Sequence, residues 1–102
     1  MGVPVILTPQ SQNDLRTIVT YIAADNPDRA RTFGYELIDK ALSISSMPGR
    51  GRVVPELNDS DVREIIYGEY RIIYELLHGP DTVFILRFWH SKRGEPDVRR
   101  PS

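Results

Sequence analysis

The stretch that decides the fold is residues 62–77, VREIIYGEYRIIYELL. Its two halves, 62–67 and 70–77, are rich in β-branched and aromatic residues, which favour strands. Gly68-Glu69 stands between them, and glycine at the first central position suits a type II′ turn. The stretch therefore predicts a β-hairpin. With a two-residue turn, its register pairs Tyr67 with Tyr70, Ile66 with Arg71, and Glu64 with Ile73.

This register divides the hairpin into two faces, because successive side chains of a strand point to opposite sides. The more apolar face is expected to meet the helices; it carries Arg63, Ile65, Tyr67, Tyr70, Ile72, Tyr74 and Leu76. The other is expected to be the open face of the sheet, with Val62, Glu64, Ile66, Arg71, Ile73 and Glu75. An ion pair of Arg71 with Glu64 or Glu75 on an open face would stabilise the fold little.

Two helices are predicted upstream of the hairpin. Thr8-Pro9 is typical of a helix start, and apolar residues then recur at helical spacing: Leu15, Ile18, Val19 and Ile22. Asn26-Pro27 repeats the start signal before a second stripe of Ala30, Phe33, Leu37, Ala41 and Ile44, widened by Ile38 and Leu42. Pro48-Gly49 ends this helix, and 49–52 is expected to be a loop. The short connection predicts an antiparallel helical hairpin.

A short strand over 3–7 precedes the helices, and Pro4 suits an edge position. A further strand over 82–89 follows the turn at 79–81, and 91–102 is expected to be an irregular tail. The order β-α-α-β-β-β predicts an α+β fold, with an antiparallel sheet packed against the helical hairpin.

The face of the last strand stays open at this point. A four-residue turn at 78–81 would place Phe84, Leu86, Phe88 and His90 beside Arg71. A turn of odd length would place Arg87 and Trp89 there instead.

Composition narrows the function classes. A chain of 102 residues predicts one domain over 1–102. It has no cysteine and two histidines, so neither a metal site nor a cofactor is predicted. The net charge of −1 argues against a general polyanion binder, although residues 78–102 sum to +2. No apolar run has the length of a membrane span and no signal peptide is evident, so a soluble, cytoplasmic protein is expected.

Several of these pieces together resemble one family. They are Asp14-Leu15, Ile18 and Tyr21-Ile22-Ala23; Asn26-Pro27, Ala30 and Phe33; Leu42 and Pro48-Gly49; Val62-Arg63-Glu64-Ile65; Tyr70-Arg71-Ile72-Ile73-Tyr74; and Ile85-Leu86 leading to His90. Over about residues 5–94 the chain resembles the RelE/ParE superfamily of bacterial type II toxin–antitoxin systems. The resemblance implies a toxin that arrests growth, serves in plasmid stabilisation and is neutralised by a cognate antitoxin protein.

Two mechanisms exist within that superfamily. The segment from Tyr21 to Pro27 looks more like the ParE branch, which implies a non-enzymatic inhibitor of DNA gyrase. The alternative is a RelE-like, ribosome-dependent mRNA endonuclease with Arg71 and His90 as catalytic residues. Glu64 and Ile66 stand where RelE carries lysines, which weakens that alternative, while Glu56 loosely resembles a carboxylate base of another branch. A third possibility is an inert family member that only binds its partner.

The resemblance also implies binding residues. Arg71, Lys92 and Arg93 are expected to contact the target, whether gyrase or, in the alternative, ribosome and mRNA. Apolar surface left by the helical hairpin and the sheet is expected to bind the antitoxin, through Leu15, Ile18, Phe33, Leu37 and Trp89.

Overall fold

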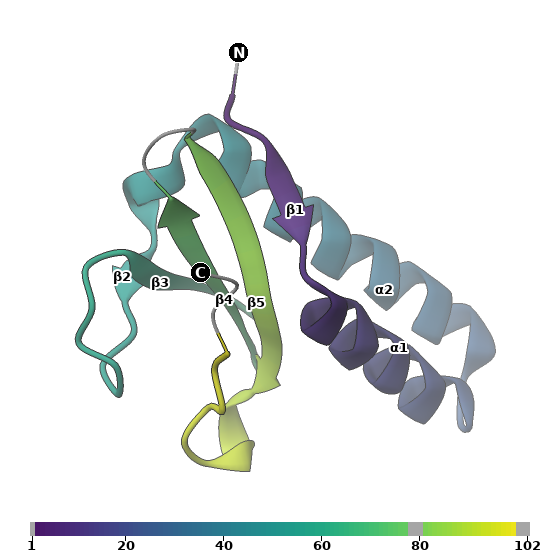
Figure 1. Ribbon diagram of the computed structural model, residues 1–102. Helices are drawn as coiled ribbons and strands as arrows, with labels where there is room; N and C mark the ends of the chain where they lie inside the picture. The colour runs from purple at the N-terminus through teal and green to yellow at the C-terminus, as the bar shows by residue number, and fades with distance from the viewer. Residues whose placement is uncertain (1, 78–80, 100–102) are drawn as a thin grey trace.

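The computed structural model describes residues 2–77 and 81–99. A sheet and a pair of helices form two layers (Figure 1). The strands are β1 Val5–Leu7, β2 Arg52–Val53, β3 Val62–Tyr67, β4 Tyr70–Leu77 and β5 Thr82–His90, and the helices are α1 Pro9–Ala23 and α2 Pro27–Leu42. Short 3₁₀ turns span Ser43–Ser46, Pro48–Arg50 and Ser91–Arg93. The predicted α+β class is confirmed.

The sheet is mixed, with strand order β1-β5-β4-β3-β2. β3, β4 and β5 form the predicted antiparallel meander. β1 lies at an edge, as expected, and runs parallel to β5, which makes the sheet mixed. The helical hairpin that follows β1 sets the direction in which this strand reaches the sheet. The expected loop at 49–52 contains the start of β2, which pairs with β3 through only two residues. A strand that short leaves no periodic pattern.

The predicted hairpin register is confirmed. Tyr67 pairs with Tyr70, Ile66 with Arg71, and Glu64 with Ile73. Gly68 has a φ of +59°, which only glycine adopts readily and which suits the predicted turn.

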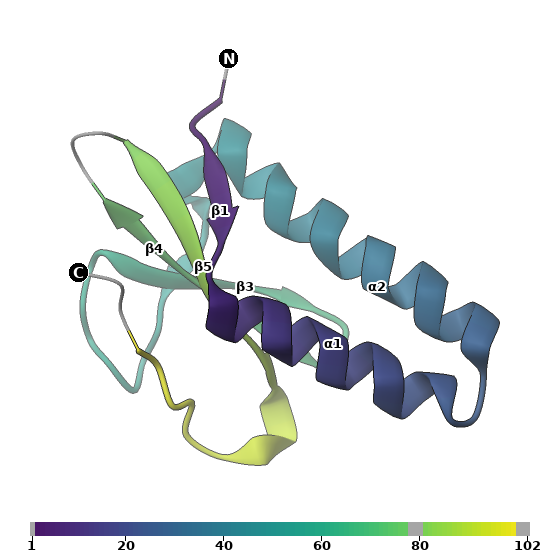
Figure 2. The ribbon, with the colours of Figure 1, turned by 45° about the vertical axis from the view of Figure 1, so that its right-hand side comes forward.

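Both helices begin where their caps predict. The side-chain oxygens of Thr8 and Asn26 accept hydrogen bonds from the backbone N–H groups of Ser11 and Arg29. The helices form an antiparallel hairpin over one face of the sheet (Figure 2). Within the described part of the chain, no helix is both long and apolar enough to cross a membrane.

The helix-covered face of the sheet is the one predicted. Its core joins helix residues such as Leu37 and Ala41 to Ile65, Ile72 and Tyr74 of the sheet.

The opposite face is not open, and that prediction was wrong. Val54, Val62, Ile73, Leu86 and Trp89 form a second cluster there, and Glu64, Arg71 and Glu75 are buried with them. Residues 54–61 and 94–99 supply the cover, since Val54 is part of the cluster and Val98 packs against it. Both segments lack a helical or strand period, so the sequence pattern gave no sign of the cover.

Both orientations predicted for the last strand occur in β5, one on each side of a bulge. Near the turn, Glu75 pairs with Phe84, and Phe84 and Leu86 lie on the Arg71 face. A bulge between Ile73 and Tyr74 then shifts the register by one residue. Beyond it, Trp89 pairs with Arg71, whereas Phe88 belongs to the helix-side core.

Candidate functional site

Arg71, on β4, is surrounded by carboxylates. Its Nε donates to Glu64 at 2.6 Å, and its two terminal nitrogens donate to both oxygens of Glu56 at 2.7 and 3.0 Å. The second Glu64 oxygen accepts from Arg52 Nε at 2.6 Å. The Arg71 side chain is only 9% exposed. The guanidinium is therefore neutralised inside the protein, and its paired faces are not available to a phosphate group.

The electrostatics of this cluster agree with its geometry. The hydrogen bonds from Arg71, together with a backbone hydrogen bond, lower the pKa of Glu56 to about 2. The same carboxylates raise the pKa of Arg71 against the opposing effect of burial. Arg71 and Glu56 thus stay charged together at neutral pH, and the pair fastens the 54–61 segment to the sheet.

His90 lies on the other side of the sheet from Arg71. Its neighbour across the strands is Tyr70, whose ring meets the imidazole edge to face at 5.1 Å. Its Nδ1 accepts a hydrogen bond from the Lys92 backbone N–H at 3.1 Å. The structure therefore does not bring Arg71 and His90 together at one site.

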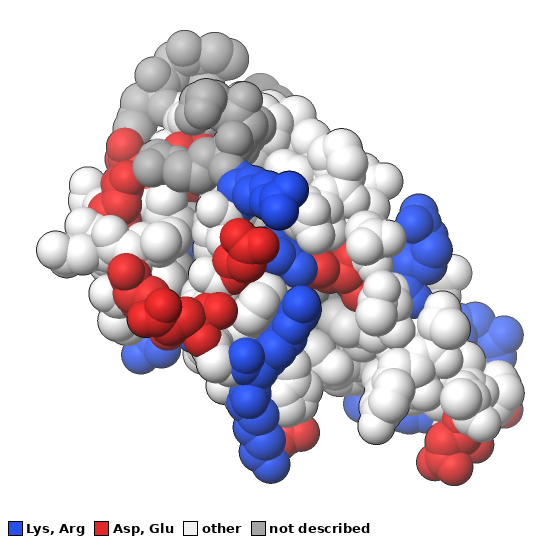
Figure 3. Space-filling view, turned by 60° about the horizontal axis from the view of Figure 1, so that its bottom comes forward, with Lys and Arg blue, Asp and Glu red and all other residues white. Residues whose placement is uncertain are grey.

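Lys92 and Arg93 follow His90 in the last 3₁₀ turn. The Lys92 side chain is 79% exposed, with its ammonium 3.7 Å from a Glu69 oxygen. The Arg93 guanidinium lies over the Trp89 ring, 4.0 Å from its centroid. Seen from this end of the molecule, basic side chains form a band through the middle of the surface, flanked by acidic ones (Figure 3). Of the three expected target contacts, these two are accessible and Arg71 is not.

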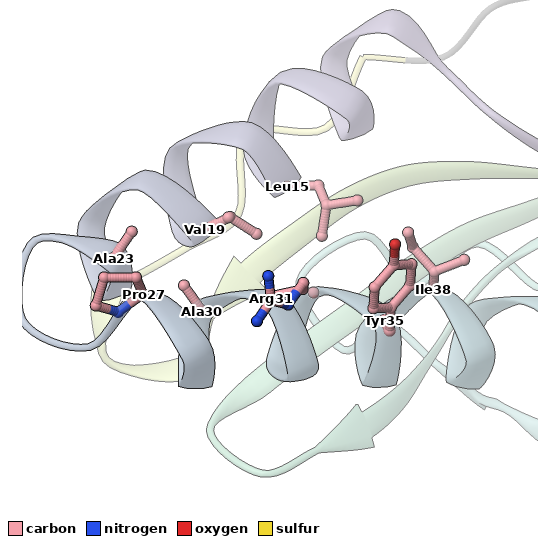
Figure 4. A pocket seen from close by; sticks show the side chains of 9 residues that line it. Leu15, Val19, Ala23, Pro27, Ala30, Arg31, Tyr35 and Ile38 are labelled. Atoms are coloured by element: carbon pink, nitrogen blue, oxygen red, sulfur yellow. The ribbon is translucent and has the colours of Figure 1, made fainter.

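An apolar groove runs between α1 and α2, with a volume of about 290 Å³. Side chains of both helices converge on it (Figure 4): Leu15, Val19, Ala23, Pro27, Ala30, Arg31, Tyr35 and Ile38. Gly34 also lines it. A Cβ on Gly34 would lie 3.0 Å from a Val19 methyl, so glycine permits the close approach of the helices here. Tyr35 is 64% exposed at the rim. The groove is suited to an apolar segment of a partner.

The residues expected to bind an antitoxin only partly coincide with this groove. Leu15 lines it. Ile18, Leu37 and Trp89 are buried core residues, and half-buried Phe33 packs against Tyr67 and Tyr70. The buried part of each helical stripe thus forms the core, and Val19, Tyr35 and Ile38 line the groove beside it. The sequence marks Val19 and Ile38 only as apolar residues of the two stripes.

A buried ion pair of Asp14 and Arg87, called the lock, joins α1, β5 and the C-terminal segment. The sequence pattern did not predict it. Arg87 donates to both oxygens of Asp14 at 2.7 Å and to the Asp97 carbonyl at 2.7 Å. Asp14 also accepts from the Phe88 backbone N–H at 3.1 Å. One signal was present, since Asp14 lies one helical turn before Ile18 and so on the buried stripe. In the described ranges, no group of three or more acidic or histidine side chains is placed to hold a metal ion.

Comparison with known proteins places this geometry in a family. The model of the ParE toxin of the type II toxin–antitoxin system parDE matches residues 5–94. The fold is similar to a chain of the chromosomal ParDE system from P. aeruginosa, with TM-score 0.73, 14% identity, and 88% of this chain and 97% of that chain covered. It is also similar to a chain of the RelBE2 toxin–antitoxin complex from Mycobacterium tuberculosis, with TM-score 0.66, 22% identity, and coverage of 88% and 99%. No curated protein matches.

At these identities the two solved structures support the fold alone, whereas the family model spans most of the sequence. The chain belongs to the ParE toxin family, within the RelE/ParE superfamily of type II toxin–antitoxin toxins.

Proposed function

We propose that this toxin acts in the cytoplasm by binding and inhibiting DNA gyrase, without chemistry of its own, and that a cognate antitoxin neutralises it. The observation that carries this proposal is the state of Arg71. The guanidinium that a nuclease would aim at a phosphate is instead held by Glu56 and Glu64.

RNA cleavage needs a base, an acid and a stabiliser of negative charge around one phosphate group. Arg71 faces the carboxylates on one side of the sheet, and His90 packs on Tyr70 on the other. A single phosphate does not reach both. This separation supports a toxin that works by occupying a surface of its target.

The antitoxin is proposed to occupy the groove between α1 and α2. An otherwise disordered segment that folds on binding covers a large surface with a short chain, and its apolar face suits such a groove. Both solved relatives come from toxin–antitoxin systems, which supports a protein partner of this kind.

The test pairs two assays on the purified chain. In a supercoiling assay with purified DNA gyrase, the chain is expected to inhibit, and addition of the antitoxin is expected to restore activity. In a translation reaction with ribosomes and a reporter mRNA, no cleavage of the mRNA is expected. Cleavage without gyrase inhibition would establish the endonuclease instead, and inactivity in both assays would favour an inert binding protein.

A variant sharpens the second assay. Arg71→Ala removes the guanidinium that the endonuclease alternative requires. If mRNA cleavage occurs and this change abolishes it while antitoxin binding persists, Arg71 is catalytic and the proposal is wrong.

A further inference from the structure

A second hollow lies beside α1, where β4 begins and β5 ends. It has a volume of about 180 Å³. It is lined from α1 by Asp14, Thr17, Ile18 and Tyr21. The opposite wall comes from Tyr70 of β4, Phe88 and His90 of β5, and Arg93 of the last 3₁₀ turn. Apolar and aromatic walls thus enclose a small number of polar groups, which is the usual construction of a binding site.

Three polar side chains that line this hollow, those of Tyr70, His90 and Arg93, can donate hydrogen bonds. Nδ1 of His90 accepts from the Lys92 backbone, so the neutral imidazole carries its proton on Nε2. Burial and the nearby Glu69 raise the pKa of Tyr70, which keeps its phenol protonated. Arg93 also lines the hollow, and its guanidinium is held by stacking over the Trp89 ring.

The acidic residue among the described lining residues is already satisfied. Both Asp14 oxygens accept from Arg87, and one also accepts from the Phe88 N–H. The charge of Asp14 is therefore balanced by Arg87, and Arg93 leaves an excess of positive charge among the described lining residues.

One carboxylate of the chain already approaches this place. A Glu69 oxygen lies 3.6 Å from His90 Nε2, and the other lies 3.7 Å from the Lys92 ammonium. Both distances exceed those of good hydrogen bonds, and the Glu69 side chain is 64% exposed. An incoming carboxylate can therefore replace these contacts with shorter ones at little cost.

We propose that the toxin contacts its target at this hollow, and that the hollow binds the carboxylate of an aspartate or glutamate side chain of the target protein. This inference rests on the proposed function as a binding toxin. Arg93 and the His90 Nε2–H supply charge-assisted hydrogen bonds to the carboxylate. Tyr21, 81% exposed on α1, covers the aliphatic part of the entering side chain.

Size and charge favour a carboxylate over a nucleotide. The volume is below the roughly 300 Å³ at which pockets for whole small molecules begin. Arg93 is the permanent cation among the described lining residues, which matches a singly charged group better than a phosphate with two charges.

The first experiment measures inhibition of gyrase supercoiling by variants. Arg93→Ala is expected to raise the concentration for half inhibition at least tenfold, the loss typical of one charge-assisted contact. His90→Asn keeps an acceptor for the Lys92 N–H but removes the Nε2 donor, and is expected to cost several-fold. Arg99→Ala is the matched control, because Arg99 lies near the same end of the chain but does not line the hollow. It is expected to leave inhibition within twofold. If wild type inhibits and Arg93→Ala matches Arg99→Ala, the inference is wrong while the proposed function stands.

The second experiment does not involve gyrase. The imidazole NMR signals of the two histidines, His78 and His90, are followed while N-acetyl-glutamate amide is added, with N-acetyl-glutamine amide as control. Saturable movement of the His90 signal with the glutamate compound alone, lost in Arg93→Ala, is expected. No saturable movement, or tighter binding of inorganic phosphate, would overturn the carboxylate assignment even if gyrase inhibition holds.

Discussion

The two faces of the sheet are built by different means. On one face, two regular helices cover the strands through apolar contacts centred on residues such as Leu37 and Ile72. On the other, two irregular segments are fastened by charged and polar groups: Glu56 to Arg71, the Asp97 carbonyl to Arg87, and the Gly94 carbonyl to Trp89 Nε1. The helices are held on the sheet by apolar residues that recur at helical spacing. The irregular segments have no such repeat, so specific hydrogen bonds and ion pairs hold them against the sheet.

The largest effect is expected at the lock between α1 and β5. Asp14→Ala leaves Arg87 buried without its carboxylate and the Phe88 N–H without its acceptor, so the free energy of unfolding is expected to fall by about 3–5 kcal/mol. Urea denaturation measures this. Asp28→Ala, which breaks an exposed ion pair, is the control and is expected to change stability by less than about 1 kcal/mol. Equal losses in the two variants would mean that the lock adds nothing.

A matched pair of leucines compares the two covers directly. Leu37 packs from α2 into the helix-side core, Leu86 lies on the face of β5 under the irregular segments, and both are fully buried. Leu37→Ala is expected to cost about 2–5 kcal/mol of unfolding free energy, and Leu86→Ala less, because loops collapse into a cavity more readily than paired helices. Denaturation of both variants measures the difference. A larger loss for Leu86→Ala would show that the irregular cover is the more rigid one.

Just before β2, the backbone at Gly51 lies close to Tyr74 and Glu64 of the sheet. A Cβ there would lie 2.5 Å from the Tyr74 hydroxyl and 2.8 Å from the Glu64 carbonyl oxygen. Gly51→Ala is expected to cost about 1–3 kcal/mol through this crowding, read from the thermal midpoint. Gly49→Ala is the control, since nothing lies within 4 Å of its added Cβ. If both variants melt together, the close approach is not strained.

The smallest effect is expected from the fastening of the 54–61 segment. Glu56→Gln is expected to cost about 1–2 kcal/mol at pH 7, because it removes the charge that pairs with Arg71, while solvent screens the partly exposed carboxylate and Arg71 keeps Glu64. The pKa of Glu56 falls from its ordinary 4.5 to about 2, so its stabilisation is present above pH 4.5 and is lost as the pH falls from 4.5 through about 2. Unfolding of wild type and variant across this range measures it. A difference at pH 2 as large as the one at pH 7 would refute the role of the charge.

Periodic residues made most of the fold predictable from sequence. The helix caps at Thr8 and Asn26 and the register around Gly68 depend on neighbours in the chain, so local rules sufficed. The candidate site was harder to predict because its partners are distant. Arg87 meets Asp14 across 73 positions, and Glu56 reaches Arg71 from a segment with no period. The predicted exposure of Arg71 failed for that reason, and its separation from His90 depends on one bulge that composition does not reveal.

The bulge has a consequence for how the chain tolerates insertions and deletions. β5 contains nine residues and β4 eight, and Leu86 is the one that the ladder skips. An extra residue elsewhere in a strand would turn every later side chain to the opposite face. Here the surplus is absorbed at one position, so deletion of Leu86 would remove a buried side chain but would leave residues 87–90 facing as they do now. β5 can thus become one residue shorter while Arg71 and His90 remain on opposite sides of the sheet.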